Sequence, residues 1–388
     1  MKIVQIGNFP INTNLIKGGV EASVYGISKA LSVDNEVHVI DFPSRVFTQD
    51  KIEVIDDLKV YRFKSNFNSN FLAFTNIPRI LRVIRNIHPD ICHVHATSLF
   101  TLILTLFLDA YKLKRVITIH GLVHIEKKQM LKSSFSIKRL FQYIYQSFSE
   151  FLIISISKNV IVDTMYVERA IEKYLQENKL FRLPFINIIP QGINDSFFDM
   201  SVPDITIVSK IISIGSINER KGHLLLLESF FAILKEFPDI LLVIIGVKSD
   251  ANYFNSLCDK INSLQIEEKV QVLTDVDNDT IIKQLETSQV FALHTREESQ
   301  GIVFCEAMAC GLPIVTTNVG GVGDVLSNKE NGLLSQYGDI ENFSCNLKRV
   351  IEDLKLRSSM SNSNKIKSHQ YNWNNIALQT IDVYHSVN

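Results

Sequence analysis

The stretch HTREESQGIVFCEAMACGLPIVTT, residues 294–317, joins two apolar strand patterns through a loop and a helix pattern. We expect the strand VFALH (290–294) to run into the loop TREESQG, a helix to begin at Gly301, and the strand PIVTT (313–317) to follow. Glu298 and Glu306 lie on either side of that glycine. This order of elements predicts a parallel α/β sheet, in which ligands bind at the carboxyl ends of the strands.

The same alternation of short apolar runs and helix patterns extends over the whole chain. In the first half we predict strands at residues 2–6, 36–41, 58–63, 90–95, 115–120, 159–163 and 187–190, with a long helix that ends at Ser157. In the second half we predict strands at residues 210–215, 240–246, 269–273, 290–294, 313–317 and 332–335. The runs are β-branched and apolar on both faces, which is typical of parallel strands covered by helices on both sides.

The length of the chain predicts two domains. A chain of 388 residues is too long for one ordinary core. A turn-rich stretch, QGINDSFFDMSVPD (191–204), separates the two series of strands. We therefore expect two Rossmann-like domains, residues 1–200 and 201–370, with a central cleft between them.

Composition and charge exclude several classes of protein. The net charge of −1 gives no support for a nucleic-acid partner. The five cysteines are scattered, odd in number and without CxxC spacing, which indicates reduced thiols in a cytoplasmic protein and no zinc site. The longest apolar run, residues 99–108, is too short to span a bilayer. The strand pattern at residues 1–6 predicts that no signal peptide is present.

Two loops that follow strands carry residues suited to bind phosphate. Gly18 and Gly19 open a helix, where backbone N–H groups can approach an anion closely. Arg220 and Lys221 lie between the strand that ends at Gly215 and the helix pattern HLLLLESFFAIL, where two cations can clamp a phosphate. The simpler alternatives are a flexible loop in the first case and a solvated charge pair in the second.

The two glutamates of residues 294–317 suit different hydroxyl groups. Glu298, in the loop at the mouth of the helix, can accept hydrogen bonds from sugar hydroxyls, together with the N–H groups of residues 299–301. Glu306, near the second turn of the helix, can accept both hydrogens of a ribose diol, because a carboxylate has several acceptor sites. The alternative is a pair of surface glutamates, which would not require Gly301 and the small residues of AMACG.

These residues carry a resemblance to a known family. EESQGIVFCEAMACGLPIVTTNVGG resembles the E-x7-E signature of the GT4-type retaining glycosyltransferases (group 1), which have the GT-B fold. Further stretches resemble family elements in the family's order: KGGVEASVYGISKAL, DICHVHATS, VITIHG, IIPQGIN, NGLLS and WNNIALQTIDVY. The resemblance implies an acceptor-binding first domain, a nucleotide-sugar-binding second domain, and a C-terminal helix at about residues 371–388 that crosses back to the first domain.

The resemblance also implies roles for single residues. His120 would contact the transferred sugar, and Arg220 and Lys221 would bind the diphosphate. Glu298 and the backbone after it would hold the sugar, and Glu306 would bind the nucleotide ribose. Gly18 and Gly19 would lie near the donor diphosphate and the acceptor. The implied catalytic residues are His120, Arg220, Lys221 and Glu298, and the implied donor-binding residues are Gly18, Gly19, Gly215, Ser216, Ser299, Gln300, Gly301, Ile302 and Glu306. The chain departs from the family at Ser216, where arginine is frequent, and at Gly323 and Asp324, where the family often has GGxPE.

The function that follows from the resemblance is a metal-independent, retaining transfer of a sugar. The donor would be a nucleotide-diphosphate sugar, most simply a UDP- or GDP-sugar, and the acceptor a glycan or lipid-linked hydroxyl in surface polysaccharide, lipopolysaccharide or glycolipid synthesis. We do not expect a metal at DVDND (275–279), where Asn278 or Asp279 is a better N-cap, nor at His93 and His95. The alternatives are another enzyme on the same fold, such as an epimerase or a phosphorylase, and a catalytically silent GT-B protein that binds a nucleotide sugar or a partner enzyme.

One segment suggests a membrane surface as a further partner. Residues 111–140 contain eight basic residues and one acid, Glu126, and the aromatic stretch FSIKRLFQYIYQSF follows from residue 135. A basic, aromatic, amphipathic segment suits an anionic lipid surface, here the inner face of the cytoplasmic membrane, or a lipid-linked acceptor. The alternative is a helix whose apolar face belongs to the core.

Overall fold

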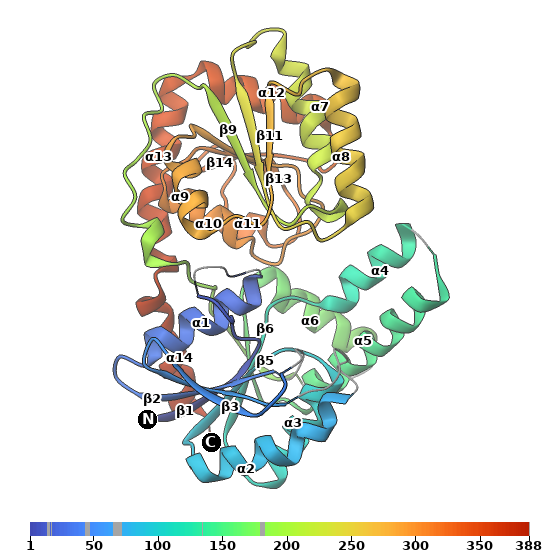
Figure 1. Cartoon of the computed structure of the whole chain (residues 1–388), viewed down its shortest axis with the longest axis vertical. Helices are drawn as coiled ribbons and strands as arrows, with labels where there is room; N and C mark the ends of the chain where they lie inside the picture. Colours follow the sequence, from blue (N-terminus) through green and yellow to red (C-terminus); the bar gives the residue numbers. More distant parts are fainter. Residues whose placement is uncertain are drawn as a thin grey trace. The chain divides into compact units, whose positions relative to one another are not determined.

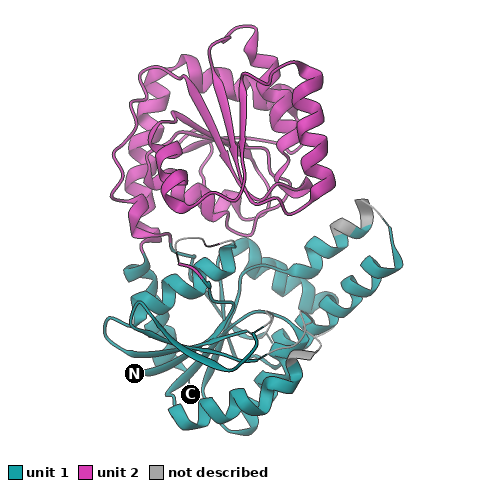
Figure 2. Cartoon of the chain, in the orientation of Figure 1, with its two compact units in different colours: residues 1–11, 18–192, 373–388 teal, residues 12–17, 193–372 magenta. Residues whose placement is uncertain are grey.

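The computed structural model describes residues 1–13, 16, 18–42, 47–64, 72–133, 135–178 and 183–387 (Figure 1). The chain divides into two compact units (Figure 2). Unit 1 comprises residues 1–11, 18–192 and 373–388, and unit 2 comprises residues 12–17 and 193–372. Each unit is built around a mainly parallel sheet with helices on both faces, which confirms the predicted fold class.

The sheet of unit 1 has eight strands in the order β3-β4-β2-β1-β5-β6-β7-β8. Neighbouring strands pair in parallel except for β3 and β4. The strands are β1 (Lys2–Gly7), β2 (Glu36–Asp41), β3 (Lys51–Ile55), β4 (Leu58–Arg62), β5 (Ile91–His95), β6 (Arg115–Ile119), β7 (Asn159–Val162) and β8 (Phe185–Ile188).

Helices cover both faces of this sheet because its strands are apolar on both sides. The helices are α1 (Gly19–Leu31), η1 (Leu72–Asn76), α2 (Ile77–Ile87), α3 (Leu99–Ala110), α4 (Val123–Ser133), α5 (Ile137–Ile156), α6 (Met165–Glu177) and α14 (Trp373–Ser386). On one face α1 and α14 pack against Ile3 and Ile91 (Figure 1). On the other face α2, α3, α5 and α6 pack against Val4 and Cys92.

Strand β3 is an element that the sequence pattern did not predict. It forms an antiparallel hairpin with β4 at the edge of the sheet. The hairpin turns at Asp56 and Asp57, whose φ angles of 46° and 65° are left-handed, as a tight hairpin turn requires. The side chains of Ile52 and Val54 are exposed, so the strand does not have the buried apolar pattern of its neighbours.

Helix α14 belongs to unit 1, as the resemblance implied, although unit 2 precedes it in the chain. Trp373, at its start, packs against two glycines. A Cβ atom at Gly26 in α1 would lie 2.1 Å from the Trp373 ring, and one at Gly192 would lie 2.5 Å from it. The indole therefore fills space that only glycine leaves open at both positions.

The sheet of unit 2 has six parallel strands in the order β11-β10-β9-β12-β13-β14. The strands are β9 (Lys210–Ile214), β10 (Leu241–Ile245), β11 (Val270–Leu273), β12 (Val290–Leu293), β13 (Ile314–Thr317) and β14 (Gly332–Ser335). The helices are η2 (Asp195–Phe197), η3 (Glu219–Lys221), α7 (His223–Leu234), α8 (Ala251–Leu264), α9 (Asn278–Glu286), α10 (Ile302–Ala309), α11 (Val322–Val325), α12 (Ile340–Glu352), α13 (Leu354–Ser368) and η4 (His369–Tyr371).

Two details differ from the sequence-based expectations. The chain leaves unit 1 at Gly192, before the boundary expected after residue 200, because Ile193, Phe197 and Met200 pack into the core of unit 2. Asp277 caps α9 by accepting a hydrogen bond from the backbone of Thr280, so the expected cap at Asn278 or Asp279 was wrong.

Among the described residues, no helix is long and apolar enough to span a membrane.

Candidate active site

The site in unit 2 forms where two neighbouring strands end. β9 leads into the loop that contains η3, and β12 leads into the loop that precedes α10. The Lys221 Nζ atom lies 2.6 Å from Glu298 Oε1, and Arg220 Nη1 lies 3.3 Å from Glu298 Oε2. Arg220 also donates a 2.9 Å hydrogen bond to the carbonyl of Glu297. Three predicted site residues from distant parts of the sequence therefore meet.

Burial and charge oppose each other at Glu298. Its side chain is buried, as is that of Lys221. Burial alone would raise the pKa of the Glu298 carboxyl, but the charges of Lys221 and Arg220 outweigh it and hold that pKa below its ordinary value. Thr295, which the sequence pattern did not single out, donates its hydroxyl to Glu298 Oε1 at 2.9 Å. The carboxylate is thus ionised and held on both oxygen atoms.

The backbone of both loops is fixed by close approaches. A Cβ atom at Gly222, whose φ is 63°, would lie 1.9 Å from the carbonyl oxygen of His294. A Cβ atom at Gly320 would lie 2.1 Å from the carbonyl oxygen of Glu298, and Gly321 donates its N–H to that same carbonyl at 2.9 Å. Glycine is therefore required at positions 222 and 320, and the loop that carries Glu298 cannot shift independently of its neighbours.

Other predicted donor-binding residues of unit 2 lie in the same two loops. The stem of Lys221 lies across Gly215, where an added Cβ would contact it at 3.2 Å. Ser216 follows that glycine after the end of β9 and is half-buried. Gly301 is the N-cap of α10, which begins at Ile302, and the side chain of Gln300 is directed to Cys305 Sγ, 3.5 Å away. Ser299 lies in the same loop, between Glu298 and the cap.

Glu306 projects from α10 and has a different environment from Glu298. Burial raises the pKa of its carboxyl to about 7, and the charge of Lys221 opposes that rise. The two glutamates therefore differ in charge near neutral pH. Glu298 is ionised, whereas Glu306 gains and loses its proton in the physiological range.

Unit 1 brings a second group of polar side chains to the carboxyl edge of its sheet. His120 follows β6, and its Nε2 lies 3.3 Å from Nδ1 of His95 at the end of β5. Its Nδ1 lies 3.4 Å from Oδ1 of Asp163, which follows β7. Gly18 caps α1 and Gly19 begins it, as predicted, while residues 14, 15 and 17 of the same loop lie outside the described residues. Asp163 was not predicted, because no sequence motif marks it.

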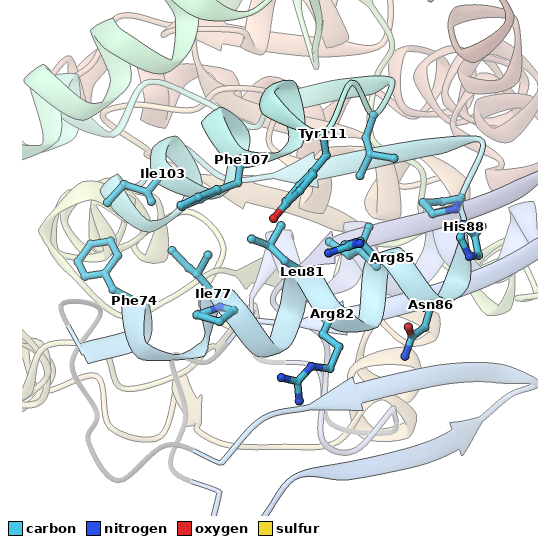
Figure 3. A pocket seen from close by; sticks show the side chains of 14 residues that line it. Phe74, Ile77, Leu81, Arg82, Arg85, Asn86, His88, Ile103, Phe107 and Tyr111 are labelled. Atoms are coloured by element: carbon cyan, nitrogen blue, oxygen red, sulfur yellow. The ribbon is translucent and has the colours of Figure 1, made fainter.

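A groove of about 940 Å³ lies elsewhere in unit 1, between α2 and α3 (Figure 3). Its lining includes Leu81 and Phe107, and also Pro89 and Leu113, which lie two residues before the starts of β5 and β6. The groove therefore opens at the amino edge of the sheet, whereas His120 lies at the carboxyl edge. It is not part of the site that contains His120.

Comparison with known proteins assigns this fold to one class. The model of the Glycosyltransferase Family 4 domain matches residues 17–197, and that of the glycosyl transferases group 1 matches residues 208–367. The sucrose-phosphate synthase of Thermosynechococcus elongatus is similar over 100% of this chain and 99% of its own, with a TM-score of 0.79 and 18% identity. The Anabaena HepE protein in complex with UDP-glucose is similar over 100% of both chains, with a TM-score of 0.74 and 15% identity.

Sequence relatives agree with this class. An uncharacterized glycosyltransferase of Methanocaldococcus jannaschii is 29% identical over 231 residues, which are 55% of this chain and 58% of that protein. The chain spans about half the length of the first curated relatives it matches. The fold and both family matches define a glycosyltransferase of the GT-B class. The chain belongs to the glycosyltransferases that these two models describe, with Glycosyltransferase Family 4 matched in its first part and the glycosyl transferases group 1 in its second.

The substitution Lys221→Met tests the buried ion pair. It leaves Glu298 with the partly exposed Arg220 as its remaining charged partner, so we expect the free energy of unfolding at pH 7 to fall by about 3 kcal/mol. The pKa of Glu298 lies below its ordinary value of 4.5, so the pair stabilises the fold above that pH and the contribution is lost as the pH falls further. Urea denaturation at pH 7 and pH 4 should show the deficit shrinking in acid.

The matched control is Lys260→Met, which breaks a half-exposed pair with Glu228 in the same unit. Such pairs contribute about 1 kcal/mol or less, so this variant should change little at either pH. A Lys221→Met deficit of equal size at both pH values would contradict the assignment of the effect to Glu298.

Proposed function

We propose that this chain is a retaining glycosyltransferase that takes its donor as a nucleotide-diphosphate sugar, most simply a UDP- or GDP-sugar. The observation that carries the proposal is the contact of Lys221 and Arg220 with the buried Glu298 at the carboxyl edge of the unit 2 sheet. Two fixed cations at this edge suit a diphosphate. The similarity to a protein solved with UDP-glucose supports a donor of this kind.

In the proposed reaction, the bond between the sugar and the diphosphate breaks and negative charge develops on the leaving phosphate. Lys221 and Arg220 would stabilise that charge, and Glu298 would hold Lys221 in place in advance. A carboxylate has lone pairs beyond those that Lys221, Arg220 and Thr295 use, so Glu298 can also accept a hydrogen bond from the sugar. The acceptor hydroxyl would attack the same face of the sugar and give its proton to the leaving phosphate oxygen.

The proposed reaction needs no metal, because the two cations supply the positive charge that a metal would give to the diphosphate. The acceptor we propose is a glycan or lipid-linked hydroxyl in surface polysaccharide, lipopolysaccharide or glycolipid synthesis. A second candidate is a catalytically silent GT-B protein that binds the nucleotide sugar or a partner enzyme. Ser216 favours it, because that position lacks the arginine that is frequent in the family.

A thermal-shift panel of UDP- and GDP-sugars with EDTA present, followed by turnover with the donor that binds, tests the function. We expect one nucleoside series to stabilise the protein and to support transfer with retained anomeric configuration, read by proton NMR. Lys221→Ala should abolish the stabilisation and lower kcat by about 100-fold or more, since it removes transition-state charge stabilisation.

The control is Lys348→Ala, which removes a half-exposed cation paired with Glu236 and should leave binding and turnover unchanged. Donor binding without transfer or hydrolysis would favour the silent protein instead. An inverted product would contradict the retaining reaction.

Glu306 gives the donor affinity a pH dependence if its carboxylate accepts the ribose diol, as we propose. With a pKa of about 7, this carboxyl is mostly protonated at pH 6 and mostly ionised at pH 8. The ionised carboxylate can accept one hydroxyl of the diol on each oxygen, whereas in the protonated form one oxygen carries a proton and acts as a donor. The Kd of the selected nucleotide sugar should therefore fall by about tenfold between these pH values. Calorimetry at pH 6, 7 and 8 measures the slope. Glu306→Gln should bind more weakly and show no slope, and a slope that persists in this variant would assign it to another group.

We also propose that unit 1 contacts an anionic membrane surface through the hairpin of α4 and α5. The side chains of Ile137, Phe141, Ile144 and Phe148 are all exposed. Their spacing places them on one face of α5, and Figure 1 shows α4 beside that helix. The surface is narrower than residues 111–140, because Arg115 is buried and paired with Asp109 at 2.7 Å, and Lys114 donates to the carbonyl of Val387.

The pair Phe141→Ser/Phe148→Ser tests this surface by co-sedimentation with phosphatidylglycerol-containing vesicles. We expect the wild type to bind anionic vesicles and not neutral ones, and the variant to lose most of the binding with its apolar contact. Ile52→Ser/Val54→Ser, which removes equally exposed side chains from β3, is the control and should bind as the wild type does. Equal binding to neutral vesicles, or no binding by the wild type, would refute the contact.

A further inference from the structure

A continuous string of hydrogen bonds connects α14 to His120 inside unit 1. The hydroxyl of Tyr384 in α14 lies 3.0 Å from Gln5 Nε2, and Gln5 Oε1 lies 2.7 Å from His95 Nε2. His95 Nδ1 then contacts His120 Nε2 at 3.3 Å. Gln5 is in β1, His95 is in β5 and His120 follows β6, so the string crosses the sheet from its first strand to its candidate site.

A second branch of hydrogen bonds begins at Tyr384. The Tyr384 hydroxyl also lies 2.7 Å from Nδ1 of His93, whose Nε2 lies 2.6 Å from the hydroxyl of Thr118. The rings of His93 and His95 are 4.0 Å apart, and those of His95 and His120 are stacked at 5.5 Å. Tyr384, His93 and Gln5 are all buried, so no solvent replaces these contacts.

The protonation states of the two buried histidines define which atoms of the string donate hydrogen bonds and which accept them. Burial lowers the pKa of His93 to about 3 and that of His95 well below its ordinary value, so both rings are neutral at physiological pH. A neutral imidazole has one N–H donor and one nitrogen acceptor. Each ring therefore donates on one side and accepts on the other. Gln5 Nε2 donates to the Tyr384 oxygen, which turns Gln5 Oε1 toward His95. Because an amide oxygen only accepts, His95 Nε2 carries the proton, its Nδ1 is the acceptor, and His120 Nε2 donates to it.

At one end of the string, His120 Nδ1 faces Asp163 Oδ1 at 3.4 Å. Within the described part of the chain, neither His120 Nδ1 nor Asp163 Oδ1 has a hydrogen-bond partner, although Asp163 is almost fully buried. A buried polar string contributes little to stability over apolar residues of the same volume. A role in packing alone does not explain a chain of five buried polar side chains that ends at an open, site-facing pair.

We propose that Tyr384 and Gln5 are positioning residues that set the tautomer and orientation of His120 toward a hydroxyl of the substrate. The inference rests on the proposed function and on the role that the family resemblance implies for His120, which is contact with the transferred sugar. It extends that function to a residue of the C-terminal helix, which the site motifs do not include. His120 then presents one defined ring nitrogen to the substrate, instead of exchanging between two tautomers.

The isosteric substitution Tyr384→Phe removes one hydroxyl and breaks the string at its centre. We expect the ring-nitrogen chemical shifts of His120, recorded by ¹⁵N NMR and assigned by their loss in His120→Gln, to move toward those of a ring that exchanges between tautomers. With donor and acceptor supplied, kcat should fall by roughly 10- to 100-fold while the KM for the donor changes much less, because the proposed diphosphate and ribose contacts in unit 2 are untouched.

Tyr174→Phe is the matched control. It removes another partly buried tyrosine hydroxyl of unit 1, which bonds to Ser147, and should change neither the His120 shifts nor kcat. Folding of Tyr384→Phe is checked by the fluorescence of Trp373, the one tryptophan of the chain, at the start of the same helix. Gln5→Met is the second variant and should produce the same change in the His120 shifts. It replaces Tyr384→Phe in this test if Tyr384→Phe does not fold.

Unchanged His120 shifts in a folded Tyr384→Phe or Gln5→Met variant would overturn the inference. An equal loss of kcat in Tyr174→Phe would also overturn it, since the effect would then be general to unit 1. The NMR readout needs no turnover, so it remains decisive if the wild type transfers no sugar. A protein that transfers no sugar and a protein in which Tyr384 does not position His120 are thus distinguished by separate measurements.

Discussion

Parallel strands place all their carboxyl ends at one edge of a sheet, and both groups of site residues depend on this constraint. In unit 2, β9 and β12 are neighbours, so the loop with Lys221 meets the loop with Glu298 although 77 residues separate them in sequence. In unit 1, β5, β6 and β7 are neighbours, so His95, His120 and Asp163 converge in the same way.

Ionised groups that are withdrawn from water need partners, and the site in unit 2 meets this need with opposite charges. Glu298 remains ionised because Lys221 and Arg220 outweigh the effect of its burial. Glu306 is close to the same lysine but gains less from it, so burial prevails there. One lysine therefore contributes to the charge of both carboxylates, and it is fixed before any ligand arrives.

Local sequence pattern was sufficient for most elements and for the residues that follow strands. The periodicity of apolar residues and the turn residues predict helix starts close to Gly19 and Ile302. The same local signals predict that Arg220, Lys221 and Glu298 lie in loops that follow strands. Contacts made over long sequence distances were not predictable in this way. Thr295 and Asp163 have no motif, and β3 lacks a buried face. The number of basic side chains available to a lipid surface was overestimated, because Arg115 and Lys114 have partners that are distant in the sequence and are seen only in the structure.

The return of α14 to unit 1 has a consequence for folding during synthesis. The ribosome completes unit 2 before it releases α14, so unit 2 can assemble while unit 1 is still incomplete. Until then Gly26 and Gly192 border an unfilled space, and Gln5 and His93 have no tyrosine hydroxyl to bond. The nascent first unit therefore exposes the apolar surface that α14 later covers, and the two parts of the chain mature in the reverse of their order in the sequence.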